Sequence, residues 1–154
     1  MKKLILILVL FLSVSAYGIE PEFQNKVVCN AEKYVGTVEI TSNRSPAIDL
    51  FNKYTGAPLG SSWCAGFVLY NYKEAADTFK VKQPLPVTGK VSYIYKAAKK
   101  NPYKYQVIKP SSVISKKEKL QPADVIIWSH GKAANNFEWA GHTGLVLSLS
   151  LIHI

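Results

Sequence analysis

The stretch Ser61–Val68, SSWCAGFV, places Cys64 where a short loop meets an apolar segment with helical spacing. Far downstream, Gly141–Val146, GHTGLV, places His142 at the start of an apolar, strand-like segment. A helix N-terminus stabilises a thiolate, because its unpaired N–H groups and the helix dipole favour negative charge. A histidine on a strand can take the thiol proton and later return it to a leaving amine. The two stretches together predict a thiol hydrolase.

Helical segments come early in the chain and strand-like segments come late. Apolar spacing and turn residues predict helices at about 22–35, 47–54, 63–76 and 91–100. Ser61 or Ser62 is expected to cap the helix that carries Cys64. Strands are predicted at 105–108, 125–128 and 142–147, with a polar hairpin loop at 130–139. This order favours an α+β fold, with helices packed on an antiparallel sheet, over alternating βαβ units.

Residues 1–18 have the pattern of a secretory signal peptide. Lys2 and Lys3 precede an apolar run, and small residues follow it up to Gly18, where cleavage is expected. The run is shorter than the roughly 20 residues that span a bilayer, although an uncleaved membrane anchor is the alternative. We therefore expect a secreted or periplasmic protein with no stable membrane span after cleavage.

About 136 residues remain after cleavage, enough for one domain with its own core, which we place at 19–148. Removal of Lys2 and Lys3 lowers the formal charge from +9 to +7. A basic exported protein suits an anionic cell-envelope polymer, and export argues against nucleic acid as the partner. The lysines between 96 and 119 are interpreted as a solvated face rather than a dedicated binding patch.

The chain has two cysteines, Cys29 and Cys64. In an exported protein two cysteines suggest a disulfide, but a stable bridge would consume the predicted nucleophile. Cys29 lies in a helix-like segment, where a free cysteine commonly behaves as a small buried apolar residue. No group of His, Cys, Asp and Glu has metal-ligand spacing, so neither a metal nor a cofactor is expected.

Four motifs in this order resemble the CHAP family of cysteine- and histidine-dependent amidohydrolases and peptidases, part of the group that includes the NlpC/P60 enzymes. They are the segment Asn43–Asp49, the cysteine motif Trp63–Val68, the strand start Pro122–Ile126 and the histidine motif Gly141–Val146. Ala123 stands where the family usually has Gly. The resemblance covers about residues 25–146.

The resemblance implies a papain-like α+β fold that cleaves amide bonds in peptidoglycan, as an N-acetylmuramoyl-L-alanine amidase or a peptide endopeptidase. Cys64 is then the nucleophile and His142 the general base and acid. The Cys64 backbone N–H is a candidate oxyanion donor, because a helix N-terminus aims donors there. Trp63 and Trp139 are candidate walls of a substrate groove, with rim packing as the alternative.

A third polar residue that orients the histidine is expected after His142, and no residue there qualifies. The tail Leu149–Ile154, LSLIHI, is what a sequencing-adapter end would encode. We therefore interpret the tail as non-native and the C-terminal strands of the domain as missing. The alternative is a genuine short apolar strand.

Two other functions remain open at this stage. One is a catalytically silent wall-binding or inhibitory module on the same fold, which would use the basic surface. The other is an amidase for small amides such as glutathione conjugates, a substrate class of some relatives, although export argues against it. The bond that is cut, the biological role and the oligomeric state are not indicated by the residues.

Overall fold

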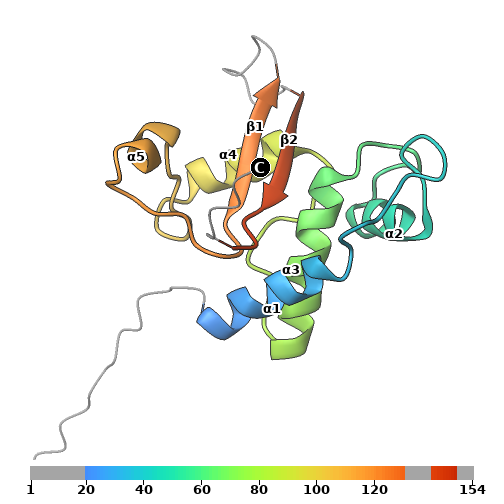
Figure 1. Cartoon of the computed structure of the whole chain (residues 1–154), viewed down its shortest axis with the longest axis horizontal. Helices are drawn as coiled ribbons and strands as arrows, with labels where there is room; N and C mark the ends of the chain where they lie inside the picture. The colour runs from blue at the N-terminus through green and yellow to red at the C-terminus, as the bar shows by residue number, and fades with distance from the viewer. Residues whose placement is uncertain (1–19, 131–139, 149–154) are drawn as a thin grey trace, which may run out of the picture.

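The computed structural model describes residues 20–130 and 140–148 (Figure 1). Within these ranges five helices precede a two-stranded antiparallel sheet, which is an α+β arrangement with the predicted order. The elements are α1 (Pro21–Glu32), α2 (Pro46–Thr55), α3 (Cys64–Phe79), α4 (Val91–Lys100), α5 (Pro110–Ile114), β1 (Val125–His130) and β2 (Ala140–Leu145). The expected signal peptide, Trp139 and the expected non-native tail lie outside the described residues.

Helix α2 shows how local sequence sets the element bounds. The Ser45 side chain accepts a hydrogen bond from the Ile48 N–H at 3.4 Å, and Pro46 follows at the first helical position, where its missing N–H costs nothing. Gly56 ends the helix in the left-handed conformation at φ +70°. These signals explain why the predicted helix at 47–54 is confirmed nearly residue for residue.

The predicted serine cap of α3 is wrong. Trp63 is the N-cap residue, and no side chain caps this helix start. Ser61 is held in the preceding turn instead, because its N–H donates to the Pro58 carbonyl at 3.1 Å and its carbonyl accepts from Asn52 at 3.0 Å. The first N–H groups of α3 are therefore left without a side-chain partner at the end that carries Cys64.

Helix α1 is shorter than the predicted 22–35. It ends at Glu32, and a series of turns leads to Gly36 at φ +86°, a conformation that suits glycine. Val35, the last residue of the predicted range, lies outside the helix and is 73% exposed. The segment after α1 is thereby free to pass beside the site described below.

The sheet is a hairpin whose register pairs Val125 with Leu145 and Trp128 with His142. Successive residues face opposite sides of a strand, so His142 shares a face with Trp128 and not with Leu145. Strand β1 extends to His130, beyond the predicted 125–128, and pairs there with Ala140. Residues 105–108 form no strand, and the prediction for them is wrong; the segment is held instead by the Tyr105 hydroxyl, which donates to the Pro84 carbonyl at 2.5 Å.

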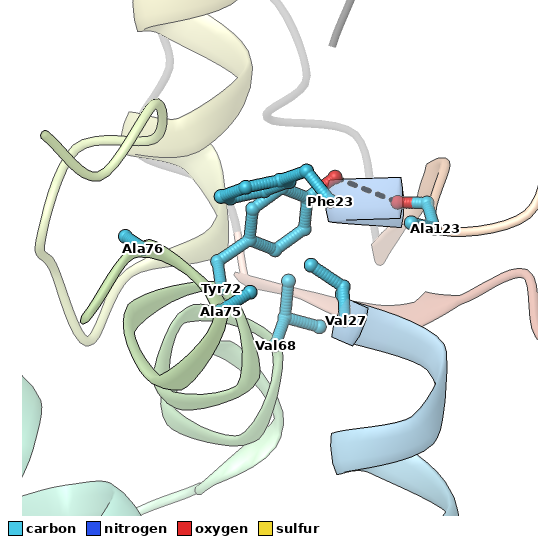
Figure 2. Packing of buried hydrophobic residues seen from close by; sticks show 7 residues of the cluster. All are labelled: Phe23, Val27, Val68, Tyr72, Ala75, Ala76 and Ala123. Carbon is cyan, nitrogen blue, oxygen red and sulfur yellow. Dashed lines mark hydrogen bonds between the residues drawn. The ribbon is translucent and has the colours of Figure 1, made fainter. Parts of the chain in front are cut away.

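The main core lies between α1, α3 and the start of β1 (Figure 2). Phe23 and Val27 of α1 pack against Val68 and Tyr72 of α3. The Tyr72 hydroxyl reaches across and donates to the Ala123 carbonyl at 2.7 Å, which joins the helix layer to the turn before β1. Full burial of side chains of this size stabilises a fold by about 1.5–3 kcal/mol each, so these contacts fix α3 relative to the hairpin.

The turn before β1 is tied to the end of β2. Ala123 donates to the Val146 carbonyl at 2.7 Å, and Val146 donates to the Asp124 carbonyl at 2.9 Å. The Asp124 carboxylate accepts from the Gln121 N–H at 2.7 Å, so it caps the local backbone as expected of an aspartate in a turn. Ala123 adopts φ +70°, a conformation that glycine takes most easily. In the described ranges no helix has the length and apolar character needed to cross a membrane.

Candidate active site

Cys64 and His142 line the same cavity, which has a volume of about 320 Å³. Its wall is formed by α1, α2 and α3, by the segments after α1 and before α3, and by β2 with the segment after it. Apart from Cys64 and His142, the lining consists of aromatic, aliphatic and small polar residues. These are Ala31, Tyr34, Val35, Thr37, Phe51, Trp63, Phe67, Thr143, Gly144, Leu145 and Leu147. The structure thus brings together the two residues that the sequence singles out for catalysis.

Cys64 is the first residue of α3 and is partly buried. It packs beside a buried cluster that includes Ala65 and Leu69 of the same helix. Because no side chain caps the helix, its positive end is directed at the region around Cys64. The Cys64 N–H is one of the backbone donors at this helix start.

His142 lies on β2 and is exposed. Its imidazole packs on the ring of its cross-strand neighbour Trp128, with ring centroids 5.7 Å apart and planes at 30°. This ring contact restricts the orientation of the imidazole. Residue pattern alone does not indicate Trp128 as a neighbour of His142, because it does not give the register that pairs the two strands.

Trp63 is both a cavity wall and a packed residue. Its indole N–H donates to Glu39 at 3.0 Å, and its ring stacks on Phe51 with centroids 6.1 Å apart. The hydrogen bond from Trp63, supported by one from the Asn43 N–H, holds the pKa of Glu39 below its usual value. Trp63 thus both lines the cavity and packs on α2, and its role as a wall of a substrate groove stays a prediction.

Two contacts position the loop that delivers Cys64. The buried Asn52 side chain of α2 donates to the Ser61 carbonyl, three residues before the cysteine. The Arg44 guanidinium forms a bidentate ion pair with Asp49 at 2.6 and 2.8 Å. The first contact ties the cysteine loop to α2, and the second ties the segment before α2 to the start of that helix.

Cys29 and Cys64 are both free thiols. Cys29 is exposed, so the interpretation of it as a small buried residue is wrong: its position on α1 faces solvent, while Phe23, Val27 and Ala31 face the core. In the described residues no three His, Cys, Asp or Glu side chains are grouped as metal ligands.

No protein-family model matches this chain, and its comparison with curated proteins and with solved structures finds no match either. The site is therefore interpreted from its own geometry.

Proposed function

We propose that this chain is an exported cysteine amidohydrolase of CHAP type that cleaves amide bonds in peptidoglycan. The observation that carries the proposal is the shared cavity of Cys64 and His142, two residues far apart in sequence. A cysteine at the start of a helix that shares a cavity with a histidine on a strand resembles the arrangement of papain-like enzymes. The α+β order of elements is compatible with that fold, and the papain-like topology is part of the proposal.

The chemistry follows the general course of thiol catalysis. The Cys64 thiol gives its proton to His142, and its sulfur attacks the scissile carbonyl carbon. The N–H of Cys64 stabilises the oxyanion, and His142 returns the proton to the amine as the C–N bond breaks. Water then hydrolyses the thioester with His142 as base, which releases the acid and restores the thiol.

The lining of the cavity bears on which amide bond is cut. None of the described lining residues is Asp, Glu, Lys or Arg. A carboxylate brought into such a site loses its hydration without gaining a partner, which is costly. Peptide-stem bonds next to glutamate or diaminopimelate carry such carboxylates, whereas the bond between the lactyl group and L-alanine is flanked by neutral groups. The cavity therefore favours amidase over stem-peptide cleavage.

The test is a digestion of purified peptidoglycan by the chain from Ile19, followed by mass spectrometry of the soluble fragments. Cys64→Ala and His142→Ala variants with unchanged circular dichroism are the controls, and Cys29→Ser is the matched thiol control. We expect fragments with new N-terminal L-alanine from wild type and Cys29→Ser only. A folded, thiol-intact wild-type protein that releases nothing would refute the proposal.

A second candidate is a catalytically silent wall-binding or inhibitory module. It is favoured by the lack, in the described part of the chain, of a hydrogen-bonded side chain that orients His142. Thiol reactivity distinguishes the two, and Cys29 provides an internal reference. If Cys64 is activated, it reacts with iodoacetamide at pH 5–6 faster than Cys29, although Cys29 is the more exposed thiol. Slower reaction of Cys64 than of Cys29 would favour the silent module.

A further inference from the structure

The positive charge of this chain is concentrated in one segment. Residues 78–117 contain ten lysines and neither Asp nor Glu. The whole chain has 19 basic and 10 acidic residues, so the part outside the segment has nine basic and ten acidic residues. The net charge of +9 therefore arises entirely from the part of the chain that includes α4 and α5.

Helix α4 arranges some of these lysines in a row. Its apolar Val91 and Ile94 are buried. The N-cap residue Lys90 and the helical residues Tyr93, Lys96 and Lys100 follow one another at spacings of three, three and four residues. Residues at these spacings share one face of a helix. We call this row the lysine–tyrosine stripe; at 1.5 Å per residue it is about 15 Å long.

Tyr93 lies in the middle of the stripe and is 45% exposed. The ammonium groups of Lys90 and Lys96 lie 5.6 and 5.7 Å from the centre of its ring. Cations at this distance are attracted to the ring face. The stripe is therefore an ordered surface in which two cations flank an aromatic platform, rather than a set of independent solvated side chains.

The stripe is separate from the cavity of Cys64 and His142. No residue from 78–117 is among the described residues that line that cavity. Helix α4 packs against both strands of the hairpin. In Figure 1, α5 and α2 lie on opposite sides of the hairpin, and α4 lies behind it.

We propose that the lysine–tyrosine stripe is a binding site for an anionic glycopolymer of the cell wall, distinct from the hydrolytic site. Lysines are compact, strongly hydrated point charges that attract a flexible polyanion without bidentate geometry, and the segment contains no arginine. Tyr93 adds a flat amphipathic surface for a sugar ring. The stripe replaces the earlier interpretation of these lysines as a merely solvated face.

A membrane surface fits less well. Helices that lie in the membrane interface bury a large apolar face in it, but the apolar residues of α4 are already buried in the protein. Nucleic acid is disfavoured by the expected export of the chain. The choice of a wall polymer therefore rests on the proposed function, whereas the existence of a polyanion site rests on the geometry of α4.

The test is a binding assay with Cys64→Ala protein, which cannot cleave by the proposed mechanism. Its cosedimentation with purified cell walls is measured against salt concentration, with walls that carry anionic phosphodiester polymers and walls stripped of them. One variant combines Lys90→Gln, Lys96→Gln and Lys100→Gln. The matched control has the same charge change outside the segment. It combines Lys26→Gln, Lys53→Gln and Lys119→Gln.

We expect the stripe variant to bind polymer-bearing walls at least about tenfold more weakly, with a shallower salt dependence, since each lysine near an anionic surface contributes an attraction of roughly fivefold. The control variant should change binding less than about threefold by the same reasoning for distant charges. Replacing the three stripe lysines by arginine should retain binding, which also guards against misfolding of the glutamine variant. Tyr93→Ala should weaken binding further.

Three results would overturn the proposal. Equal losses in the two lysine variants would show that net charge alone acts. Equal binding to stripped walls would exclude the polymer as the ligand. Tighter binding to anionic lipid vesicles or to single-stranded DNA than to the polymer would assign the stripe to another partner. Release of peptidoglycan fragments by wild type is measured independently, so failure of this site and failure of the hydrolase proposal are distinguishable.

Discussion

Substitution of Gly66 by alanine tests the closest approach between two helices at the site. Gly66 lies in α3, two residues after Cys64, and faces Phe51 of α2. A Cβ added at Gly66 would lie 2.8 Å from the Phe51 carbonyl oxygen, 2.9 Å from its carbonyl carbon and 3.0 Å from its Cβ. These are backbone and near-backbone atoms, so the clash cannot be relieved by rotation of a flexible side chain.

Two opposing effects set the magnitude. Alanine in place of a helical glycine stabilises by up to about 1 kcal/mol, and Gly66 lies in the first turn of α3. Overpacking of a tight contact typically costs about 1–3 kcal/mol, and contact with backbone atoms puts Gly66→Ala at the upper end of that range. We therefore expect a net loss of about 1–2 kcal/mol, which for a domain of this size lowers Tm by roughly 3–8 °C.

Thermal and urea unfolding measure the loss, with Gly144→Ala as the matched control. A Cβ at Gly144 would lie 3.8 Å from the Trp128 ring, an ordinary contact, so this variant should be unchanged or slightly more stable. Displacement of α2 should also move Phe51, which stacks on Trp63, and so change the alkylation rate of Cys64. A Gly66→Ala protein as stable as wild type would refute the close approach of α2 and α3.

Three further variants test the turn before β1 and the histidine. Burial raises the pKa of Asp124 above its usual 3.8, partly opposed by the Gln121 N–H. The stability contributed by this carboxyl is thus present below about pH 4 and lost as pH rises through the folded-state pKa. Urea unfolding should show Asp124→Asn gaining stability relative to wild type between pH 3 and pH 7, and a pH-independent difference would contradict this. Ala123→Gly relieves about 1 kcal/mol of strain from the left-handed backbone but loses about 0.8 kcal/mol from the buried methyl group. The Tm should therefore barely change. A decrease of more than about 1.5 kcal/mol in the free energy of unfolding would show that packing dominates. Trp128→Leu should lower kcat on peptidoglycan about tenfold with little change in KM, since a residue that holds a catalytic group in place acts on the chemical step. It should also shift the ring-proton resonances of His142. If kcat and these resonances are both unchanged, Trp128 does not position the histidine.

The helices were predictable where local chemistry marks both ends. Helix α2 lies between the capping Ser45 and the left-handed Gly56, and the predicted range 91–100 agrees with α4. Helix α5 was missed because it has five residues and none of them is buried, so it leaves no apolar periodicity to detect. The predicted strand at 105–108 failed for the opposite reason: its residues suit a strand, but a strand also needs a hydrogen-bonded neighbour, which residue pattern does not supply.

The elements that carry Cys64 and His142 were predictable, because each begins close to turn or loop residues that mark element starts. The remaining wall of the cavity was not predictable. Val35 and Thr37 reach it only because α1 ends early and the chain turns beside α3, a tertiary course without a local signal. The serine cap failed because Asn52, from another helix, takes the Ser61 carbonyl and fixes the loop in a different turn.

Charge is divided between two parts of the molecule, and the division has a physical consequence. The cavity of Cys64 and His142 has no described lining residue with a carboxylate, ammonium or guanidinium group, while the net positive charge lies in 78–117. The lysines that attract a polyanion over a long range therefore lie away from the cavity. A cation beside the scissile bond would instead draw carboxylates into the site. In the proposed enzyme, the lysine–tyrosine stripe raises the local concentration of wall polymer, and the neutral cavity selects the bond. The attraction of the polymer and the selection of the bond thus lie on different elements. Because salt screens the attraction strongly and the selection weakly, the two effects should respond differently to ionic strength.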